Sequence, residues 1–265
     1  MLRGTVLGLM VSLTLALSGS VPAVALEVIE DFEDAEAAQN APVTDWTVVS
    51  NRAGNMRYRN QYRLPAGSAF AGYLQSEWDG GDTTAEKPFT YLNAGYIEYW
   101  MNQASPLGVT VGLGDQLLSF VDDSGDGLAL YIYSDGSTNE FGAPLMNIMD
   151  HNEVLLGNPL VAGDWHWDFN VQFRNIDLTA HTYDLRVYGF HDGIEQPGDE
   201  IALDGLSMKG TPTDLTRMYL QVTNDPGPVD NYNIRYDDIM QEIPEPATLV
   251  LLGAGGMALI RRRRR

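Results

Sequence analysis

Short runs of alternating apolar and polar residues fill the chain between residues 27 and 243, and this pattern constrains the fold more than any other feature. In residues 94–103 one face carries Tyr96, Glu98 and Trp100, and the other carries Ile97, Tyr99 and Met101. A period of two is typical of a half-buried β-strand, because successive side chains point to opposite sides. No stretch sustains the 3.6-residue period of a helix. The pattern therefore predicts an all-β domain.

Runs of the same kind predict further strands at residues 109–113, 116–121, 128–133, 166–176, 181–190, 215–223 and 231–242. Gly, Asp, Asn and Pro separate these runs, and these residue types favour turns. No linker interrupts the block, so roughly a dozen short strands belong to one domain. This arrangement favours a β-sandwich or jelly roll over residues 26–243.

The first 25 residues have the parts of a secretory signal peptide. Arg3 supplies a positive charge, residues 6–17 are mainly apolar, and Ala23 and Ala25 are the small residues that a signal peptidase requires. We expect cleavage after Ala25. The alternative is an uncleaved anchor helix, which the short apolar run does not favour.

The C-terminal segment has an apolar stretch between a Pro-Glu-Pro sequence and a run of arginines. The order is Pro244, Glu245, Pro246, the apolar residues 247–260, then Arg261, Arg262, Arg263, Arg264 and Arg265. Fourteen helical residues span about 21 Å, short of the roughly 30 Å hydrocarbon core. Arginine stems extend the span by reaching the interface, and the positive-inside rule keeps them cytoplasmic. We therefore predict a short transmembrane helix over residues 247–260, with the acidic domain outside. An ordinary tail anchor is the alternative.

Residues 244–265 resemble the PEP-CTERM sorting signal, with its three parts in the expected order. The resemblance implies processing by an exosortase, a membrane-embedded cysteine transpeptidase, near Pro244, Glu245 and Pro246. It also implies a transient stay at the inner membrane, then release or transfer to the cell surface or extracellular matrix. Such proteins occur in bacteria that make exopolysaccharide, often in a biofilm.

The charge of the exported domain argues against nucleic-acid binding. The net charge is −20, and Arg3 with the arginine tail accounts for 6 of the 16 basic residues, which leaves 16 − 6 = 10 against nearly all of the 36 acidic ones. Such a surface repels phosphate backbones. The chain has no cysteine, which excludes thiol catalysis, cysteine-ligated zinc and iron–sulfur clusters.

Several segments resemble concanavalin A-like (laminin G-like) jelly rolls and related carbohydrate-binding modules. They are residues 29–33 (IEDFE), 96–100 (YIEYW), Trp165 with 183–187 (YDLRV), and 236–239 (YDDI). The resemblance spans most of residues 27–243. It implies a jelly-roll β-sandwich, a fold that carries lectins, hydrolases, lyases and adhesive modules.

In related jelly rolls a structural calcium ion often joins the first and last strands. Here the resemblance implies Asp31 or Glu33 together with Asp237 or Asp238. Calcium takes six to eight oxygen ligands, which two adjacent acidic strands and their carbonyls could supply. The alternative is that these carboxylates face solvent or pair with Arg235. Calcium is therefore a candidate cofactor.

Residues 122–127 have the acidic start of an EF-hand loop, but Tyr133 stands where the bidentate Glu belongs. We predict a hairpin turn there, with a weak calcium loop as the alternative.

No catalytic motif was found. The E-x-D-x-x-E strand of laminarinase-like enzymes is missing, and Glu98 is the one carboxylate of its strand. His166 and Asp168 share a face, but no nucleophile signature accompanies them. G-x-S-x-G and H-E-x-x-H are missing as well. We expect a protein that is not an enzyme.

Aromatic residues are the remaining indication of function. Trp46, Tyr58, Tyr62 and Trp78 lie in polar, turn-rich surroundings, where their rings could stack on sugars, whereas Trp100 and Trp165 fit the core better. The sequence therefore favours a non-catalytic glycan-binding or structural module with extracellular polysaccharide as its partner. The alternative is a polysaccharide-degrading enzyme, a glycoside hydrolase or lyase.

Overall fold

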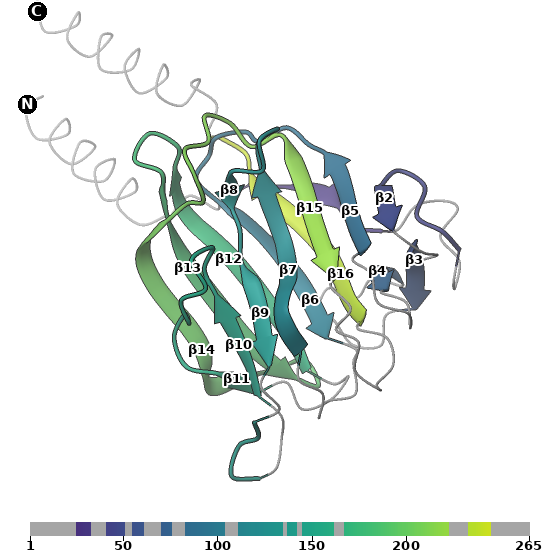
Figure 1. Cartoon of the computed structure of the whole chain (residues 1–265), viewed down its shortest axis with the longest axis vertical. Coiled ribbons are helices and arrows are strands. Elements are labelled where there is room, and N and C mark those ends of the chain that lie inside the picture. Colours follow the sequence, from purple (N-terminus) through teal and green to yellow (C-terminus); the bar gives the residue numbers. More distant parts are fainter. Residues whose placement is uncertain are drawn as a thin grey trace, which may run out of the picture.

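The computed structural model describes residues 25–32, 41–50, 55–60, 70–75, 83–103, 111–134, 137–141, 145–161, 167–222 and 233–244. Within these ranges the regular elements are all strands. They form two eight-stranded sheets packed face to face (Figure 1). The predicted all-β sandwich is confirmed.

Sheet A contains the first and the last strand of the domain. Its order is β14 (Ile194–Ser207), β13 (Thr182–His191), β12 (Trp167–Asp177), β6 (Ile97–Gln103), β16 (Asn233–Glu242), β4 (Phe70–Gln75) and β3 (Asn55–Asn60), with β1 (Leu26–Glu30) also paired to β16. All of these pairs are antiparallel.

Sheet B forms the second layer. Its order is β11 (Leu160–Val161), β10 (Leu145–Met149), β9 (Tyr131–Ser134), β7 (Val111–Val121), β15 (Arg217–Val222), β5 (Thr83–Pro88) and β2 (Thr47–Ser50), with β8 (Gly127–Leu128) also paired to β7. The chain passes between the sheets after β1, β2, β4, β5, β6, β11, β14 and β15, as a jelly roll requires.

The alternation predicted for residues 94–103 determines which side chains of β6 face the core. Ile97, Tyr99 and Met101 are fully buried between the sheets, while Glu98 and Trp100 are half-buried on the outer face of sheet A. Placing Trp100 in the core was therefore wrong. Its ring instead meets the edge of Phe190 from β13, with the ring centroids 4.9 Å apart.

A central aromatic cluster joins the two layers. Tyr99 and Phe173 come from sheet A and Phe120 comes from sheet B, with ring centroids between 5.9 and 6.4 Å apart. All three side chains are fully buried. Edge-on and tilted contacts of this kind add to the hydrophobic stabilisation from burial.

The sequence prediction differs from the structure at several strands, and it gave no strand for β2, β3, β4, β5, β10 or β11. The separate strands expected at residues 109–113 and 116–121 are the single strand β7. The whole of β14 was missed, because Pro197 and Gly198 are typical of turns. β14 lies at the edge of sheet A, where a proline leaves no inner hydrogen bond unmade.

A buried carboxylate fastens the start of the domain to both sheets. Glu30, at the end of β1, accepts hydrogen bonds from the Phe32 amide at 3.0 Å, the Trp46 indole at 3.2 Å and the Lys87 ammonium at 2.5 Å. Lys87 belongs to β5 of sheet B and also pairs with Asp45. Removing the cation would leave a buried charge uncompensated.

This arrangement determines where Trp46 lies. Its ring stacks on Phe32, with the centroids 6.2 Å apart, and only 5% of the side chain is exposed. A ring buried to this extent offers no face to a sugar. Its placement among the glycan-binding candidates is therefore corrected, since the Glu30 carboxylate takes up the polar end of the indole.

The described ends of the domain lie side by side. Leu26 pairs with Glu242, and the Ile243 amide donates to the Ala25 carbonyl at 2.8 Å. Among the described residues there is no helix long and apolar enough to cross a membrane. The predicted signal peptide up to Val24 and the predicted helix 247–260 lie outside these residues.

We predict that Lys87→Met destabilises the domain by about 3 kcal/mol, because Glu30 then stays buried without its cation. Urea denaturation would measure the loss. The double variant with Glu30→Gln should recover at least about 1 kcal/mol, since no buried charge remains. Equal stability of the two variants would contradict this role for the pair.

The pH dependence of the same contact has a definite sign. Burial lowers the pKa of Lys87, but its hydrogen bonds and ion pairs with Asp45 and Glu30 outweigh burial and raise the pKa above 10.5. The stabilisation should therefore be complete below pH 10.5 and be lost as the pH rises through the higher folded value.

Candidate functional site

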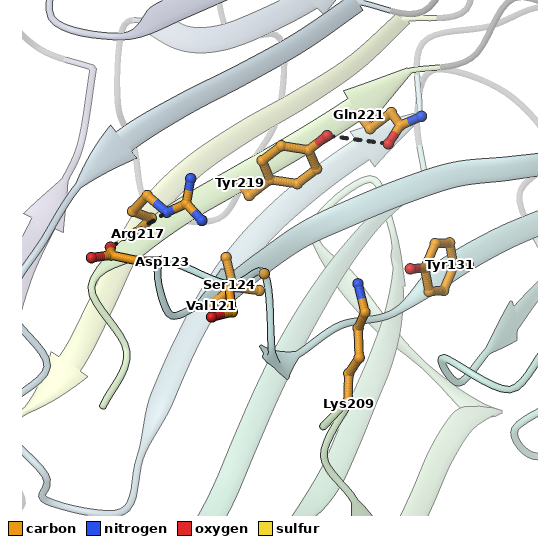
Figure 2. A pocket seen from close by; sticks show the side chains of 9 residues that line it. Val121, Asp123, Ser124, Tyr131, Lys209, Arg217, Tyr219 and Gln221 are labelled. Atoms are coloured by element: carbon orange, nitrogen blue, oxygen red, sulfur yellow. Dashed lines mark hydrogen bonds and ion pairs between the residues drawn. The ribbon is translucent and has the colours of Figure 1, made fainter. Parts of the chain in front are cut away.

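The outer face of sheet B carries a pocket of about 490 Å³ (Figure 2). Strand β15, the hairpin between β7 and β8, and the segment after β14 contribute its walls. The residues that line it include Tyr131, Lys209, Arg217, Tyr219, Gln221 and the hairpin residues 123–125. We call this pocket the sheet B groove.

Alternation along β15 directs three side chains into the groove. Met218 and Leu220 are buried in the core, so Arg217, Tyr219 and Gln221 point outward. The Tyr219 hydroxyl donates to the Gln221 amide oxygen at 3.2 Å. This contact fixes a half-buried aromatic ring next to an amide group.

The β7–β8 hairpin forms one wall of the groove. The Asp122 carboxylate accepts from the backbone amides of Ser124 at 2.7 Å and Asp126 at 3.0 Å. These bonds close the turn, and Val121 pairs with Gly127 across it. The hairpin predicted for residues 122–127 is confirmed.

Lys209 is tied to this hairpin through its main chain. Its amide donates to the Gly127 carbonyl and the Gly127 amide donates back, each at 2.9 Å. Its half-buried side chain extends into the groove, where the ammonium points toward the Tyr131 side of the pocket (Figure 2). The backbone bonds therefore fix where the ammonium enters.

Arg217 joins the floor of the groove to its rim. Its guanidinium donates to Glu86 at 3.0 Å and to the Asp122 carbonyl at 2.7 Å, and its Nε lies 3.9 Å from Asp123. Asp123 is also held by the Thr216 hydroxyl at 2.9 Å. This cation is thus largely occupied by the protein itself.

Tyr131 is the second aromatic residue of the groove. Burial, together with the charge of Glu153, raises the pKa of its phenol, so the hydroxyl stays protonated at neutral pH. Tyr131 and Tyr219 line the same pocket from β9 and β15, and β7 lies between these strands. Two ring surfaces with amide, hydroxyl and ammonium groups beside them can bind a polar ligand with apolar faces.

The outer face of sheet A carries a separate polar network. Glu98 accepts from the Tyr96 hydroxyl at 2.6 Å and from the Gln172 amide at 3.3 Å. Arg174 donates twice to the Gln172 oxygen, at 2.9 and 2.5 Å, and lies over the Tyr96 ring. A pocket of about 500 Å³ lies beside Tyr96 and Arg174.

Glu98 is less isolated in the fold than its own strand suggests. It is the one acid of its strand, but neighbouring strands surround it, and Asp237 of β16 lies opposite Trp100 on the same face. Burial, followed by the hydrogen bond and charge of Glu98, raises the pKa of Tyr96 well above its ordinary value. Tyr96 therefore serves Glu98 as a protonated donor.

The residues predicted to bind calcium are only partly brought together. β1 and β16 pair, as expected of the first and last strands, so the register carries Asp31 toward Asp238. Asp237 is fully buried, whereas Asp31 is exposed, and Glu33 lies outside the described residues. No group of three or more His, Asp or Glu side chains suited to a metal occurs among the residues described.

The remaining predicted residues are placed as follows. Tyr58 belongs to β3, but its side chain is outside the description, as are Tyr62, Trp78, Trp165 and His166. Asp168 is buried and accepts from the Asn102 amide at 2.9 Å. The sorting residues beyond Pro244 and the signal residue Ala23 also lie outside.

Sequence reasoning singled out the hairpin residues 123–125 only as a turn or a weak calcium loop, and it missed the other side chains of the sheet B groove. The strand at residues 215–223 was predicted, and its alternation alone places Arg217, Tyr219 and Gln221 on one face. That signal was available. Tyr131 and Lys209 join them through strand order and a loop contact, which alternation does not reveal.

The C-terminal segment completes this description. Residues 242–265 match the PEP-CTERM protein-sorting motif. The PEP-CTERM motif marks the chain as an exported protein. The match begins at Glu242, the last residue of β16, so the motif follows the folded domain directly. A search of curated protein sequences gives no match.

Solved structures show similarity in fold. A carbohydrate esterase from the Shiga toxin-encoding bacteriophage phi24B aligns with a TM-score of 0.50 and 16% identity, over 83% of this chain and all of that chain. The catalytic domain of a glycoside hydrolase family 131 protein from Coprinopsis cinerea gives 0.46 and 13%, over 72% and 78%. The Emp47p carbohydrate recognition domain gives 0.43 and 13%, over 86% and all of that chain. Identities of this size concern the fold alone.

We predict that Gly127→Ala destabilises the domain by about 2 kcal/mol and weakens the groove wall. A Cβ there would lie 2.3 Å from the Phe120 carbonyl oxygen, at a φ of +150°. Gly125→Ala is the matched control, because its Cβ meets nothing within 4 Å and only its φ of +82° is unfavourable, costing about 1 kcal/mol. Thermal unfolding would compare them; a larger loss for Gly125→Ala would refute the steric account.

Proposed function

We propose that the protein is a non-catalytic glycan-binding protein of the cell surface or extracellular matrix, and that the sheet B groove holds the glycan. The observation that carries this proposal is the convergence of Tyr131 and Tyr219 with Gln221 and Lys209 in one open pocket. Sugar rings have apolar C–H faces and polar edges. Tyrosine rings suit the faces, while amide and ammonium groups suit the hydroxyls.

The groove also has the stiffness that a binding site needs. Hydrogen bonds within the protein already fix Tyr219, Arg217 and the hairpin, so little side-chain freedom remains to be lost on binding. A preformed site of this kind suits a polymer of repeating units, whose affinity per unit is modest. The exported location that the sorting motif indicates is where such polymers occur.

We predict that Tyr219→Ala lowers glycan affinity at least tenfold, equal to about 1.4 kcal/mol, because the stacking surface is lost. Tyr219→Phe should keep most of the affinity, since the ring remains. Affinity electrophoresis against a panel of soluble neutral and acidic polysaccharides would measure the effect.

Tyr188→Ala is the control, because Tyr188 is a half-buried tyrosine on the outer face of the other sheet. If wild type binds a polysaccharide and Tyr219→Ala binds it equally well, the groove is not the site. If wild type is retained by no polysaccharide, glycan binding itself is refuted.

The absence of catalysis belongs to the same proposal. Glycoside hydrolysis needs one carboxyl group as acid and a second as base or nucleophile. Glu98 already receives hydrogen bonds from Tyr96 and Gln172, which supports a structural role for this carboxylate. New reducing or unsaturated sugar ends, released by wild type and not by Glu98→Gln, would favour the enzymatic alternative.

Sorting by an exosortase is the finer part of the proposal. Strand β16 finishes at Glu242, and Ile243 is held by the Ala25 carbonyl, so the fold closes just before Pro244. Residues 244–246 follow directly in the sequence, where a peptidase at the membrane surface would meet them. The domain would then pass to the cell surface or matrix intact. A calcium ion between β1 and β16 stays a prediction, which melting with and without a chelator would test.

We predict that mature protein from cells with the sorting machinery lacks Arg261 to Arg265 and terminates near residues 244–246. Intact-mass spectrometry would show this. Replacing Pro244, Glu245 and Pro246 by alanine should retain the full C-terminus, because the recognition sequence is gone. A wild-type mass that includes all five arginines would contradict exosortase processing.

A further inference from the structure

The sheet B groove contains a cation that no carboxylate among the described residues neutralises. Among the described cations, Lys87 pairs with Glu30 and Asp45, Arg186 pairs with Asp204, and Arg217 pairs with Glu86. Within the same residues, Lys209 has no carboxylate within ion-pair distance. Arg174 also lacks such a carboxylate, but its guanidinium is held by Gln172 and the Tyr96 ring, whereas the Lys209 side chain has no such contact among the described residues.

The fold nevertheless holds Lys209 firmly at the groove. Its backbone makes two hydrogen bonds with Gly127, and the next residue, Gly210, adopts a φ of +61° against Asp126. The side chain is half-buried and extends into the pocket between the hairpin and Tyr131 (Figure 2). An ordinary surface lysine needs none of this positioning.

From this geometry we propose that the groove binds a glycan that carries carboxylate groups, such as a polyuronate, and that Lys209 pairs with the carboxylate. The inference rests on the proposed glycan-binding function and adds the class of glycan. Tyr219 and Tyr131 stack on the faces of the sugar rings, while the Lys209 ammonium selects ligands that carry a carboxylate. A carboxylate on the ligand supplies the ion-pair partner that no described residue gives Lys209.

The surroundings of Lys209 favour a single negative charge over a multiply charged group. Asp123 lines the same pocket, and Glu86 is bound to Arg217 nearby. These carboxylates repel a dianionic phosphate more than a carboxylate. Arg217 keeps its guanidinium on Glu86 and the hairpin, so Lys209 is the groove's available cation.

The net charge of −20 repels any polyanionic ligand at long range. At 0.15 M salt the Debye length is about 8 Å, so distant acidic residues are largely screened while a contact pair is not. Short oligomers reduce the long-range repulsion further. The local pair should therefore prevail under these conditions.

The test compares oligogalacturonate with its methyl ester, which has the same backbone and no charge. Titration calorimetry at 0.15 M salt should show that wild type binds the acid form at least tenfold more tightly than the ester. Lys209→Met should remove this preference, and Lys209→Arg should keep most of it. Both variants should melt like wild type, since the structural bonds of Lys209 come from its main chain.

Arg186→Gln is the matched control, because it makes the same change in net charge on the other sheet. It should leave the preference for the acid form unchanged. Equal binding of acid and ester by wild type would overturn the carboxylate assignment while glycan binding stands. If Lys209→Met keeps the wild-type preference for the acid form over the ester, Lys209 is not the selecting group. Tighter binding of a sulfated oligomer than of the uronate would also overturn it. Loss of all glycan binding would instead refute the function on which the inference rests.

Discussion

The packing of two inner sheet faces against each other is the constraint on which the rest of this structure depends. Tyr99 and Phe173 meet Phe120 at the centre of the sandwich, and each strand commits alternate side chains to that contact. The other half of every strand is thereby left for solvent. Function in such a domain is a property of its outer faces, and the two faces here differ in chemistry.

The outer face of sheet A is occupied by its own hydrogen bonds. Glu98, Gln172 and Arg174 satisfy one another across two strands, and Tyr96 completes the chain. The sheet B groove is different, because its polar groups are fixed at their base and reach outward. In a domain so rich in acid, the place of each cation is informative: Lys87 holds the layers together, whereas Lys209 faces the groove.

Much of the fold could be predicted from the sequence, because alternation is a local signal. Alternation divided β6 into its two faces correctly, although Trp100 was expected in the core, and the turn residues at 122–127 predicted the hairpin. It failed for Trp46, whose acceptor Glu30 lies 16 residues away and was not expected to be buried. The polar residues around Trp46 in the sequence suggested an exposed side chain, but the hydrogen bond to Glu30 makes its burial favourable.

The candidate site was harder to predict because it is assembled from distant segments. β15 supplied a readable pattern, but Tyr131 reaches the groove through the strand order β9-β7-β15 and Lys209 through two backbone bonds to Gly127. No local pattern in a single sequence reveals the strand order or the backbone bonds of Lys209. The PEP-CTERM motif is the opposite case, since its whole content lies in consecutive residues and it was recognised directly.

The position of β16 has a consequence for the order of events during export. Although it is the last strand, it lies inside sheet A between β6 and β4 and also pairs with β1. A chain that emerges from its N-terminus cannot complete sheet A until residues 233–242 are free, and such long-range pairing is slow to form. The apolar segment at 247–260 follows only a few residues later. Sheet A can therefore be completed only when nearly the whole chain, up to the sorting motif, is available for folding.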